Sequence, residues 1–85
     1  MAEKITLSPS FKRDYQSLPQ EIQKKADKQI RFLFENPNHP SLKMHRLDDY
    51  YWEFYVDRFY RGVCTRKEGV LELLFVGTHK LIDRW

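Results

Sequence analysis

The amino-acid sequence predicts an α+β fold in which a helical hairpin packs on one face of a mainly antiparallel sheet of four to five strands. Three observations lead to this fold class. A short, partly β-branched segment opens the chain. Two stretches follow in which apolar residues recur every three or four positions, the period of an amphipathic helix. The second half alternates apolar and polar residues and is rich in aromatic side chains, which indicates strands. Strand, helices and then strands is an order typical of α+β layers.

The opening strand and the first helix are predicted from a short junction. Residues 4–7 end at Ser8-Pro9, which suits a strand that leads directly into a helix. Serine is a preferred N-cap, and proline fits the first helical position because that position needs no backbone N–H donor. Phe11 and Tyr15, four residues apart, form an apolar stripe on this helix. We expect the helix to end at Leu18-Pro19.

A second helix is predicted over residues 20–35. Its apolar side chains recur on one face, and most of its charged side chains lie on the other. The apolar face carries Ile22, Ala26, Ile30, Leu33 and Phe34. The segment 36–40 contains two prolines and should end the helix, because proline resists helix continuation and disfavours helical geometry in the preceding residue.

Four strands are predicted near residues 42–47, 52–56, 59–66 and 70–76, with turns at 48–49, 57–58 and 67–69. The last strand is apolar on nearly both faces, so we expect it to be central in the sheet. Residues 77–79 should break that strand, and residues 80–85 are expected to form one helical turn. The helical hairpin should cover one face of the sheet and leave the other open.

The composition predicts one small cytosolic domain over residues 1–85. With 41% hydrophobic residues, the chain can bury enough apolar surface to fold alone. Fifteen Lys and Arg against twelve Asp and Glu give a net charge of +3, which permits a polyanionic partner without requiring one. No apolar run approaches the length of a signal sequence or a membrane span. We therefore expect no contact with a membrane.

Several chemistries lack the residues they need. Cys64 is the single cysteine, so an internal disulfide is impossible and a cysteine-rich zinc module is excluded. His39, His45 and His79 lack the short pairwise spacing of a zinc site, so we expect no metal. The three glycines form no phosphate-binding loop, and no nucleophile elbow of the serine hydrolases is present. The sequence therefore gives no reason to expect a cofactor.

Arg61 is the first candidate for a functional side chain. It lies in the middle of a predicted strand, where alternation directs it away from the face that carries Tyr60, Gly62 and Cys64. We expect these small residues to allow close packing by the helices. Arg61 would then project from the open face, where a planar guanidinium can bind a phosphate. An ion pair with Glu53 or Asp57 on the neighbouring strand is the alternative.

The histidines and Trp85 each have two interpretations. His79 follows the last strand, at a strand end where reactive side chains are often displayed. It is a candidate proton donor or an ordinary hydrogen-bonded surface histidine. His45 is likewise a candidate catalytic group, but it could equally well be a solvated polar side chain at an exposed strand position. His39 lies between two prolines and is interpreted as structural or neutral. Trp85 would either stack on a base or dock on the sheet.

The order of these landmarks resembles the RelE/ParE superfamily of bacterial type II toxins. The resemblance covers essentially the whole chain and rests on the spacing of many short motifs. They are Ser8-Pro9, Leu18-Pro19, Asn36-Pro37, His39-Pro40, His45-Arg46-Leu47, Trp52, Tyr60-Arg61 and Val76-Gly77-Thr78-His79. Within the superfamily the chain is most similar to the YoeB and YafQ type of messenger-RNA endonucleases. This resemblance implies a small, microbial-ribonuclease-like α+β fold.

The resemblance also implies a mechanism and site residues. His45 matches the position that is read as the general base in these toxins. Arg61 matches the strand arginine that steadies the scissile phosphate, and His79 matches the histidine read as the general acid. Trp52 lies as many residues before Arg61 as the corresponding position does in those toxins. We also expect Arg46, Arg58, Lys80 and Trp85 to contact the RNA. The implied activity is metal-independent, ribosome-dependent cleavage of messenger RNA, which inhibits translation and needs no cofactor.

This sequence departs from the superfamily's patterns at three places. Glu53 and Tyr55 fall where some relatives carry paired catalytic lysines, so that subtype's mechanism does not apply here. Asp48-Asp49 stands where relatives often have a glycine, which predicts a different shape for the turn beside His45. Lys80 replaces an aromatic residue that follows the histidine in some relatives.

The resemblance implies a cognate antitoxin, the ribosome and messenger RNA as partners, with operator DNA bound only through the antitoxin. The antitoxin would inhibit either by covering His79 and Arg61 or by displacing the C-terminal turn. Two alternative functions share this fold. One is a ParE-like inhibitor of DNA gyrase, and the other is an inert module that only binds an antitoxin. The joint presence of His45, Arg61 and His79 argues against the gyrase inhibitor, which needs no such set.

Overall fold

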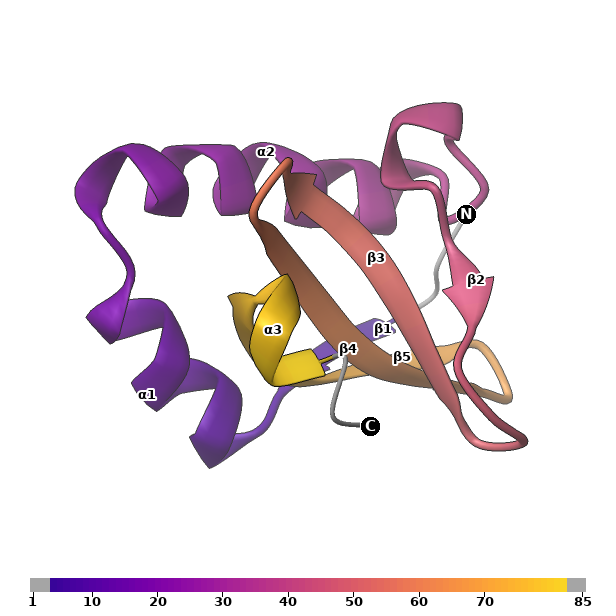
Figure 1. Ribbon diagram of the computed structural model, residues 1–85. Helices are drawn as coiled ribbons and strands as arrows, with labels where there is room; N and C mark the ends of the chain where they lie inside the picture. The colour runs from indigo at the N-terminus through magenta and orange to yellow at the C-terminus, as the bar shows by residue number, and fades with distance from the viewer. Residues whose placement is uncertain (1–3, 83–85) are drawn as a thin grey trace.

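The computed structural model describes residues 4–82, which form a five-stranded sheet with two long helices (Figure 1). The elements in chain order are β1 (Lys4–Leu7), α1 (Pro9–Ser17), α2 (Gln20–Glu35), the 3₁₀ turn η1 (Pro40–Leu42), β2 (His45–Arg46), β3 (Tyr51–Asp57), β4 (Tyr60–Lys67), β5 (Val70–Thr78) and α3 (His79–Ile82). Within residues 4–82 no helix is long and apolar enough to cross a membrane. The α+β class predicted from the sequence is confirmed.

The strand order is β1-β5-β4-β3-β2. β1 pairs with β5 in parallel, and the other neighbouring strands are antiparallel. β5 is therefore paired on both sides, as its apolar sequence predicted, although β4 occupies the middle of the sheet. The first and last strands of the chain lie side by side in parallel, which is possible because the chain between them, the helical hairpin included, is long enough to cross the sheet.

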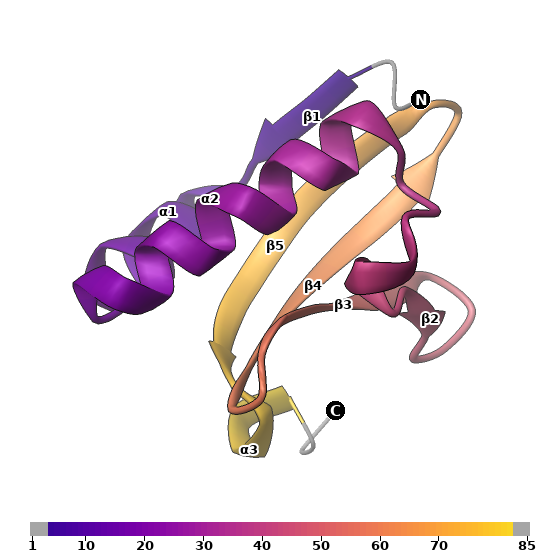
Figure 2. The ribbon, with the colours of Figure 1, turned by 90° about the horizontal axis from the view of Figure 1, so that it is seen from above.

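Both long helices pack on one side of the sheet, α1 against β5 and α2 against β3, and in Figure 2 α2 lies in front of α1. Ser8 is the N-cap of α1, since its side chain accepts a hydrogen bond from the backbone of Phe11, and Pro9 opens the helix as predicted. The core joins α1, α2 and the near face of the sheet. Its fully buried large side chains include Phe11, Leu33, Leu42, Phe54 and Leu73.

Buried Gln29 fixes α2 against the rest of the fold. Its side-chain amide donates hydrogen bonds to the backbone carbonyls of Ser41, at 3.1 Å, and Tyr55, at 2.7 Å. One polar side chain thus satisfies an acceptor in η1 and another at the edge of β3, where the short β2 no longer covers the strand. This contact holds the segment between α2 and β2 against the edge of β3.

The strand predicted over residues 42–47 is wrong, because only His45–Arg46 pair with β3. Pro40 instead begins a 3₁₀ turn, and the His39 ring accepts a hydrogen bond from the backbone of Ser41 and caps that turn. Lys43 then adopts a left-handed conformation with φ of 46°. A residue in that region reverses the chain and cannot continue a ladder, so strand pairing starts only at His45.

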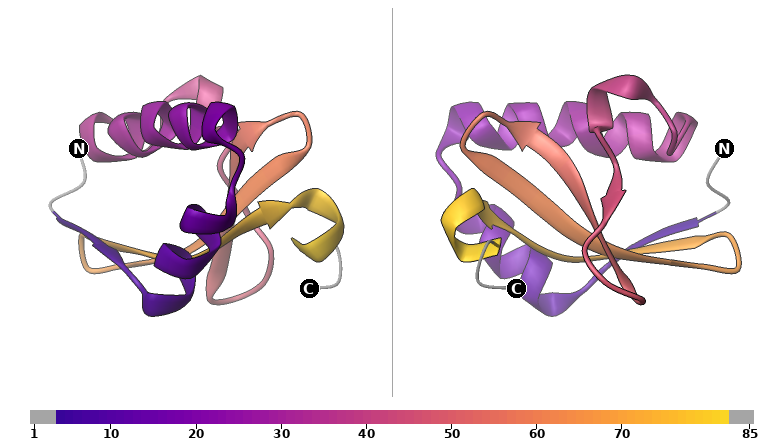
Figure 3. Two further views of the ribbon diagram at one scale, coloured as in Figure 1. Left: turned by 90° about the vertical axis from the view of Figure 1, so that its left-hand side faces the viewer. Right: turned by 45° about the vertical axis from the view of Figure 1, so that its right-hand side comes forward.

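The predicted break at residues 77–79 is also wrong in its position. Gly77 pairs with Arg61 and Thr78 pairs with Tyr60, so β5 continues to Thr78 and α3 begins at His79. The backbone N–H of His79 donates to the carbonyl of Phe59, at 2.8 Å. Figure 3 shows α3 at this end of β5. The predicted C-terminal turn is present as far as Ile82, and residues 83–85 lie outside the described part of the chain.

The second face of the sheet is not wholly open. α3 packs against β4 and β5. Ile82 is buried and so is Val63, yet neither belongs to the core under the long helices. Val63 alternates with Gly62 and Cys64 and therefore points to the face opposite that core. The short helix α3 thus covers one end of the second face and leaves the part near β2 exposed.

Gly62 has a different role from the one predicted. A side chain at this position would place its Cβ 2.1 Å from the Phe54 ring, whereas the sequence suggested close packing by a helix. Phe54 is the register partner of Gly62 on β3 and lies over the bare backbone. The glycine therefore makes room for a cross-strand aromatic ring, which then fills the core beneath the helices.

Candidate functional site

The second face of the sheet brings two of the predicted catalytic residues together. His45 is the register partner of Glu53, and Glu53 is the partner of Val63 on β4. Arg61 lies two residues from Val63 and pairs with Tyr55. Because side chains alternate along a strand, these residues share the face that the long helices leave uncovered. The predicted direction of Arg61 is confirmed by this register.

The carboxylate of Glu53 lies between His45 and Arg61. Its Oε1 atom is 3.4 Å from Nε2 of His45 and 3.7 Å from Nε of Arg61. Glu53 is only 9% exposed, whereas more than half of the His45 side chain is accessible. A buried carboxylate gains most from cationic or hydrogen-bonding neighbours, because burial removes the water that would otherwise solvate it. Glu53 therefore links exposed His45 and partly buried Arg61 into one cluster.

The hydrogen bond at Nδ1 sets the tautomer of neutral His45. Nδ1 lies 3.1 Å from the carbonyl oxygen of Lys43, and a carbonyl can only accept, so Nδ1 carries the proton. The lone pair of the neutral ring is then on Nε2, the atom that faces Glu53. In this tautomer Nε2 can accept a proton, and the neighbouring carboxylate attracts the imidazolium that results.

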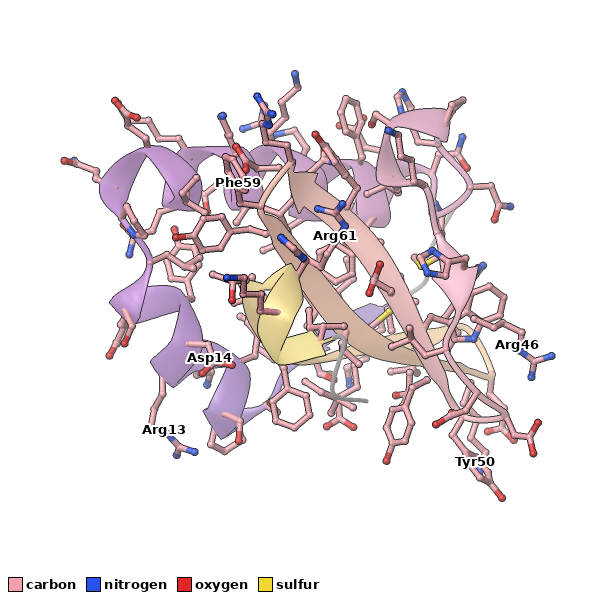
Figure 4. All side chains as sticks on the ribbon, in the orientation of Figure 1. Arg13, Asp14, Arg46, Tyr50, Phe59 and Arg61 are labelled. Carbon is pink, nitrogen blue, oxygen red and sulfur yellow. The ribbon has the colours of Figure 1, made fainter. Side chains whose placement is uncertain are left out.

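Arg61 is held in place by the backbone. Its Nη1 atom donates to the carbonyls of Asp57 and Tyr60, and the guanidinium lies 4.8 Å from the centre of the Tyr55 ring. Among residues 4–82, the hydrogen bonds and the ion pair of Arg61 involve Nη1 and Nε and not Nη2. Figure 4 shows Arg61 in front of β3 and β4, on the same side as α3. The ion pair with Glu53 considered from the sequence is present, and it leaves part of the donor fork free.

Asp57, the other predicted partner of Arg61, pairs with Lys25 instead, at 2.7 Å. Its second carboxylate oxygen accepts a hydrogen bond from the backbone of Phe59. The hydrogen bond from Lys25, and after it the one from the Phe59 backbone, lowers the pKa of Asp57. The contact between Lys25 and Asp57 also raises the pKa of Lys25. Asp57 thus fixes the β3–β4 turn through its side chain and holds Arg61 through its carbonyl.

His79 lies on the far side of Arg61 from His45. It follows Gly77, the register partner of Arg61, by two residues, so strand geometry puts the two Cα atoms about 8 Å apart. His45 is three strands away from His79, about 14 Å across the sheet, and its row on β5 is at Phe75, four residues or about 13 Å along the strand before His79. The structure therefore brings His79 next to Arg61 but not next to His45. The order across the face is His45, Glu53, Arg61 and His79.

The residues predicted to bind RNA are spread over two faces. Arg46 pairs with Trp52 and its guanidinium lies 5.6 Å from the centre of that ring, on the side of the long helices. Figure 4 shows Arg46 pointing away from Arg61. Arg58 lies 5.0 Å from the ring of Phe59 beside α3, and exposed Lys80 belongs to α3 itself. Trp85 lies outside the described residues.

Two residues discussed from the sequence have structural roles. His39 stacks on Phe32, with ring centres 4.0 Å apart, and caps η1. Cys64 is fully buried in the core, and burial raises the pKa of its thiol to about 12. Among residues 4–82, no three His, Cys, Asp or Glu side chains converge on one point where a metal ion could bind.

Two members of the cluster were not predicted from the sequence. Glu53 was expected as a partner of Arg61 but not of His45, and no role was expected for Lys43. The Nζ atom of Lys43 lies 4.8 Å from the centre of the Tyr55 ring, the same ring that Arg61 contacts. The alternation of β3 indicates that Glu53 and Tyr55 share a face. It does not indicate which residue of the short β2 lies opposite them.

Solved structures with the same fold come from bacterial and archaeal toxin systems. YafQ from E. coli strain BL21(DE3) is 19% identical, with a TM-score of 0.77, and the alignment covers 92% of this chain and 94% of that chain. A chain of the RelB-RelE antitoxin-toxin complex from Methanococcus jannaschii is 16% identical, with a TM-score of 0.76 and coverage of 93% and 95%. The YoeB/ParE toxin from Agrobacterium tumefaciens is 23% identical, with a TM-score of 0.73 and coverage of 89% and 98%.

These likenesses show that the chain shares the fold of solved YafQ, RelE and YoeB/ParE toxins, which is the fold that the sequence resemblance implied. The sequence matches no protein-family model and no curated protein. The shared fold does not by itself assign an activity.

Proposed function

We propose that the protein is the toxin of a type II toxin–antitoxin system and acts in the cytosol as a ribosome-dependent endoribonuclease. The observation that carries this proposal is the shared Glu53 carboxylate, which links His45 and Arg61 on the uncovered face of a RelE-type sheet. A proton acceptor beside a fixed guanidinium suits the cleavage of a phosphodiester. The resemblance of the whole chain to the YoeB and YafQ type supports RNA as the substrate.

In the proposed reaction the 2′-hydroxyl of the message attacks its own 3′-phosphate. Nε2 of His45 takes the hydroxyl proton as the new P–O bond forms. The P–O bond to the 5′-oxygen of the next nucleotide breaks, and the His79 imidazolium gives that oxygen a proton. The products are a 2′,3′-cyclic phosphate and a free 5′-hydroxyl. Such proton transfers contribute about 10²–10⁴-fold to a rate.

Arg61 would stabilise the charge that develops on the non-bridging phosphate oxygens. Its Nη1 and Nε atoms are engaged by two carbonyls and by Glu53, so the guanidinium does not reorganise when substrate binds. The Nη2 donors remain for the phosphate. His45 and His79 lie on opposite sides of Arg61, which suits an in-line displacement in which base and acid approach the phosphorus from opposite directions.

An antitoxin partner is part of the proposal. A groove of about 280 Å³ lies between β1, α1 and α2, and its apolar lining includes Leu7, Phe11, Tyr15 and Ile30. Leu7 is 41% exposed and belongs to the edge strand β1, whose outer side pairs with no strand among the described residues. A short amphipathic segment of an acidic antitoxin fits this combination of an apolar groove and a net positive toxin. Operator DNA would then be bound only through the antitoxin.

Primer extension on a message in a reconstituted bacterial translation system tests the function. We expect the parent protein to cut within codons only when ribosomes are present and to leave 2′,3′-cyclic phosphate ends. His79→Ala and Arg61→Ala should each slow cleavage by about 10²-fold or more. Arg13→Ala is the matched control, because Arg13 is an exposed residue of α1 whose Nη2 bonds only to the side chain of Ser10 among described residues.

A parent protein that leaves the message intact would contradict the proposal. If it then inhibited DNA supercoiling by gyrase, the ParE-like function would replace it. If it did neither and still bound an antitoxin, the protein would be an inert module. If His79→Ala cleaves the message at an unchanged rate, the endoribonuclease function would stand, but His79 would not be the proton donor.

A further inference from the structure

A second cationic surface lies on the opposite side of the sheet from Arg61. Trp52 on β3 contacts two arginines from its neighbouring strands. The guanidinium of Arg66 on β4 lies 4.8 Å from the centre of the Trp52 ring, and that of Arg46 on β2 lies 5.6 Å from it. Trp52 is partly buried against the core, so its ring is held by the fold. The aromatic ring in turn orders two long basic side chains at the surface.

A pocket of about 330 Å³ adjoins this stack. We call it the Trp52 pocket. Its lining combines Lys43, Met44, Trp52 and Arg66 with the turn at 38–40. The volume is at the lower end of the range for small-molecule sites and suits a group of about one nucleotide. Met44, Trp52 and Pro40 give apolar surface for a base or a ribose, and Lys43 and Arg66 give positive charge.

The charges of this surface are not neutralised within the described residues. The ion pairs among residues 4–82 lie elsewhere and involve Lys25, His45 and Arg61, and none involves Lys43, Arg46 or Arg66. Arg46 instead donates to the carbonyl of Asp49. An arginine stacked on an aromatic ring uses its face and leaves its in-plane N–H donors for an anion. The surface is therefore complementary to a polyanion with flat, apolar groups.

Lys43 connects the Trp52 pocket with the catalytic face. It lines the pocket, and its Nζ atom lies 4.8 Å from the centre of the Tyr55 ring, which also contacts Arg61. β2 contains only two residues, and the segment that includes η1 and Lys43 lies against the edge of β3 beyond Glu53. A flexible single strand can pass over this segment from Arg61 to Trp52, with the Lys43 cation between them.

We infer that the Trp52 pocket binds one nucleotide of single-stranded RNA that flanks the cleaved bond, with its phosphate on Lys43 and Arg66 and its base or ribose against Trp52. Alternation of phosphates and bases along RNA matches the alternation of cations and an aromatic ring at this site. The inference rests on the proposed function for the identity of the ligand, but it concerns binding and not cleavage. An acidic protein segment is the competing occupant.

Trp52 fluorescence and RNA affinity test the inference. The chain has two tryptophans, so Trp85→Phe leaves Trp52 as the only one. In this background we would titrate the full chain with a fluorescein-labelled oligouridylate of about ten nucleotides, without ribosomes, and measure tryptophan emission and anisotropy. We expect saturable quenching of Trp52. Arg66→Gln should weaken binding about tenfold and reduce the slope of log K against log salt by about 0.7, the value for one single-strand phosphate contact.

The matched control is Arg13→Gln, which removes the same charge from α1. Figure 4 shows Arg13 and Arg46 at opposite ends of the molecule. We expect the control to bind like the parent, and Lys43→Gln to behave like Arg66→Gln. A melting curve for each variant excludes misfolding as the cause.

Two results would overturn the inference. One is an equal effect of Arg66→Gln and Arg13→Gln, which would indicate general electrostatic attraction. The other is unchanged Trp52 emission with RNA but quenching by a poly-glutamate peptide that depends on Arg66, which would make the pocket a protein-docking site. Arg61→Ala separates the two proposals. It should lose cleavage and keep Trp52 quenching, so failure of the endonuclease assay alone leaves the binding result intact.

Discussion

Oε1 of Glu53 lies 3.4 Å from Nε2 of His45, and this contact links the exposed end of β2 to a nearly buried carboxylate on β3. The same oxygen is 3.7 Å from Nε of Arg61. The Lys43 carbonyl at Nδ1 orients the ring, and the Glu53 carboxylate beside Nε2 stabilises the imidazolium that forms when this nitrogen accepts a proton. Glu53 thus qualifies as a positioning residue for the proposed base.

Glu53→Gln should reduce kcat for message cleavage by about tenfold and leave KM within about twofold, because the amide keeps the shape of the side chain but not its charge. Single-turnover cleavage on programmed ribosomes separates the two parameters. Glu72→Gln is the control, since Glu72 is an exposed carboxylate on β5 that points to the same face. A fall in thermal stability with unchanged kcat would instead assign Glu53 a structural role.

Asp57 should make the fold sensitive to acid. Because its pKa is lowered in the folded state, its contribution to stability is complete above its ordinary value of 3.8 and is lost as the pH falls through the lower, folded-state pKa. At pH 7, Asp57→Asn should lower the free energy of unfolding by about 1 kcal/mol, through weaker hydrogen bonds to Lys25 and the Phe59 backbone.

Urea unfolding of the parent and Asp57→Asn from pH 7 down to pH 2 checks this prediction. The difference between the two proteins should shrink at the acid end, and Lys25→Gln should show a smaller pH dependence than the parent. A difference in stability that is the same at both ends of the series would contradict the linkage.

Gly62→Ala should destabilise the protein by about 2 kcal/mol, because the added methyl group would overlap the Phe54 ring. For a domain of this size we expect the melting temperature to fall by about 10 °C. The double variant with Phe54→Leu tests the cause. A smaller side chain at 54 makes room for the methyl group, so the two costs should not add. Full additivity would show that Phe54 does not constrain residue 62.

Cys64 should not react with thiol reagents in the folded protein. It is fully buried, and with a pKa of about 12 only about one thiol in ten thousand is ionised at pH 8. Titration with Ellman's reagent should show no reaction in buffer and one thiol per chain in guanidinium chloride. Rapid reaction of the native protein would mean that the core opens easily around β4.

Local signals were sufficient to predict much of the fold. The Ser8 cap, Pro9 and the period of the apolar residues determine both helices, because capping and amphipathicity act within one or two turns. The glycine at 69 predicted the β4–β5 turn, where Glu68 and Gly69 both adopt positive φ. The segment 42–47 was mispredicted because its alternation looks like a strand, while the 3₁₀ turn and the left-handed Lys43 depend on contacts with β3 and α2.

For the candidate site, too, the sequence predicted the local features and not the contacts between distant residues. The sequence by itself determined that Arg61 points away from Gly62 and Cys64, since alternation along one strand is a local property. It also identified His45 and His79 as chemically capable groups. Only the tertiary structure decided that His45 meets Glu53, that Arg46 turns to Trp52 on the other face, and that His79 lies beside Arg61 but far from His45. Each of these depends on strand register, which is set by contacts between residues distant in the sequence.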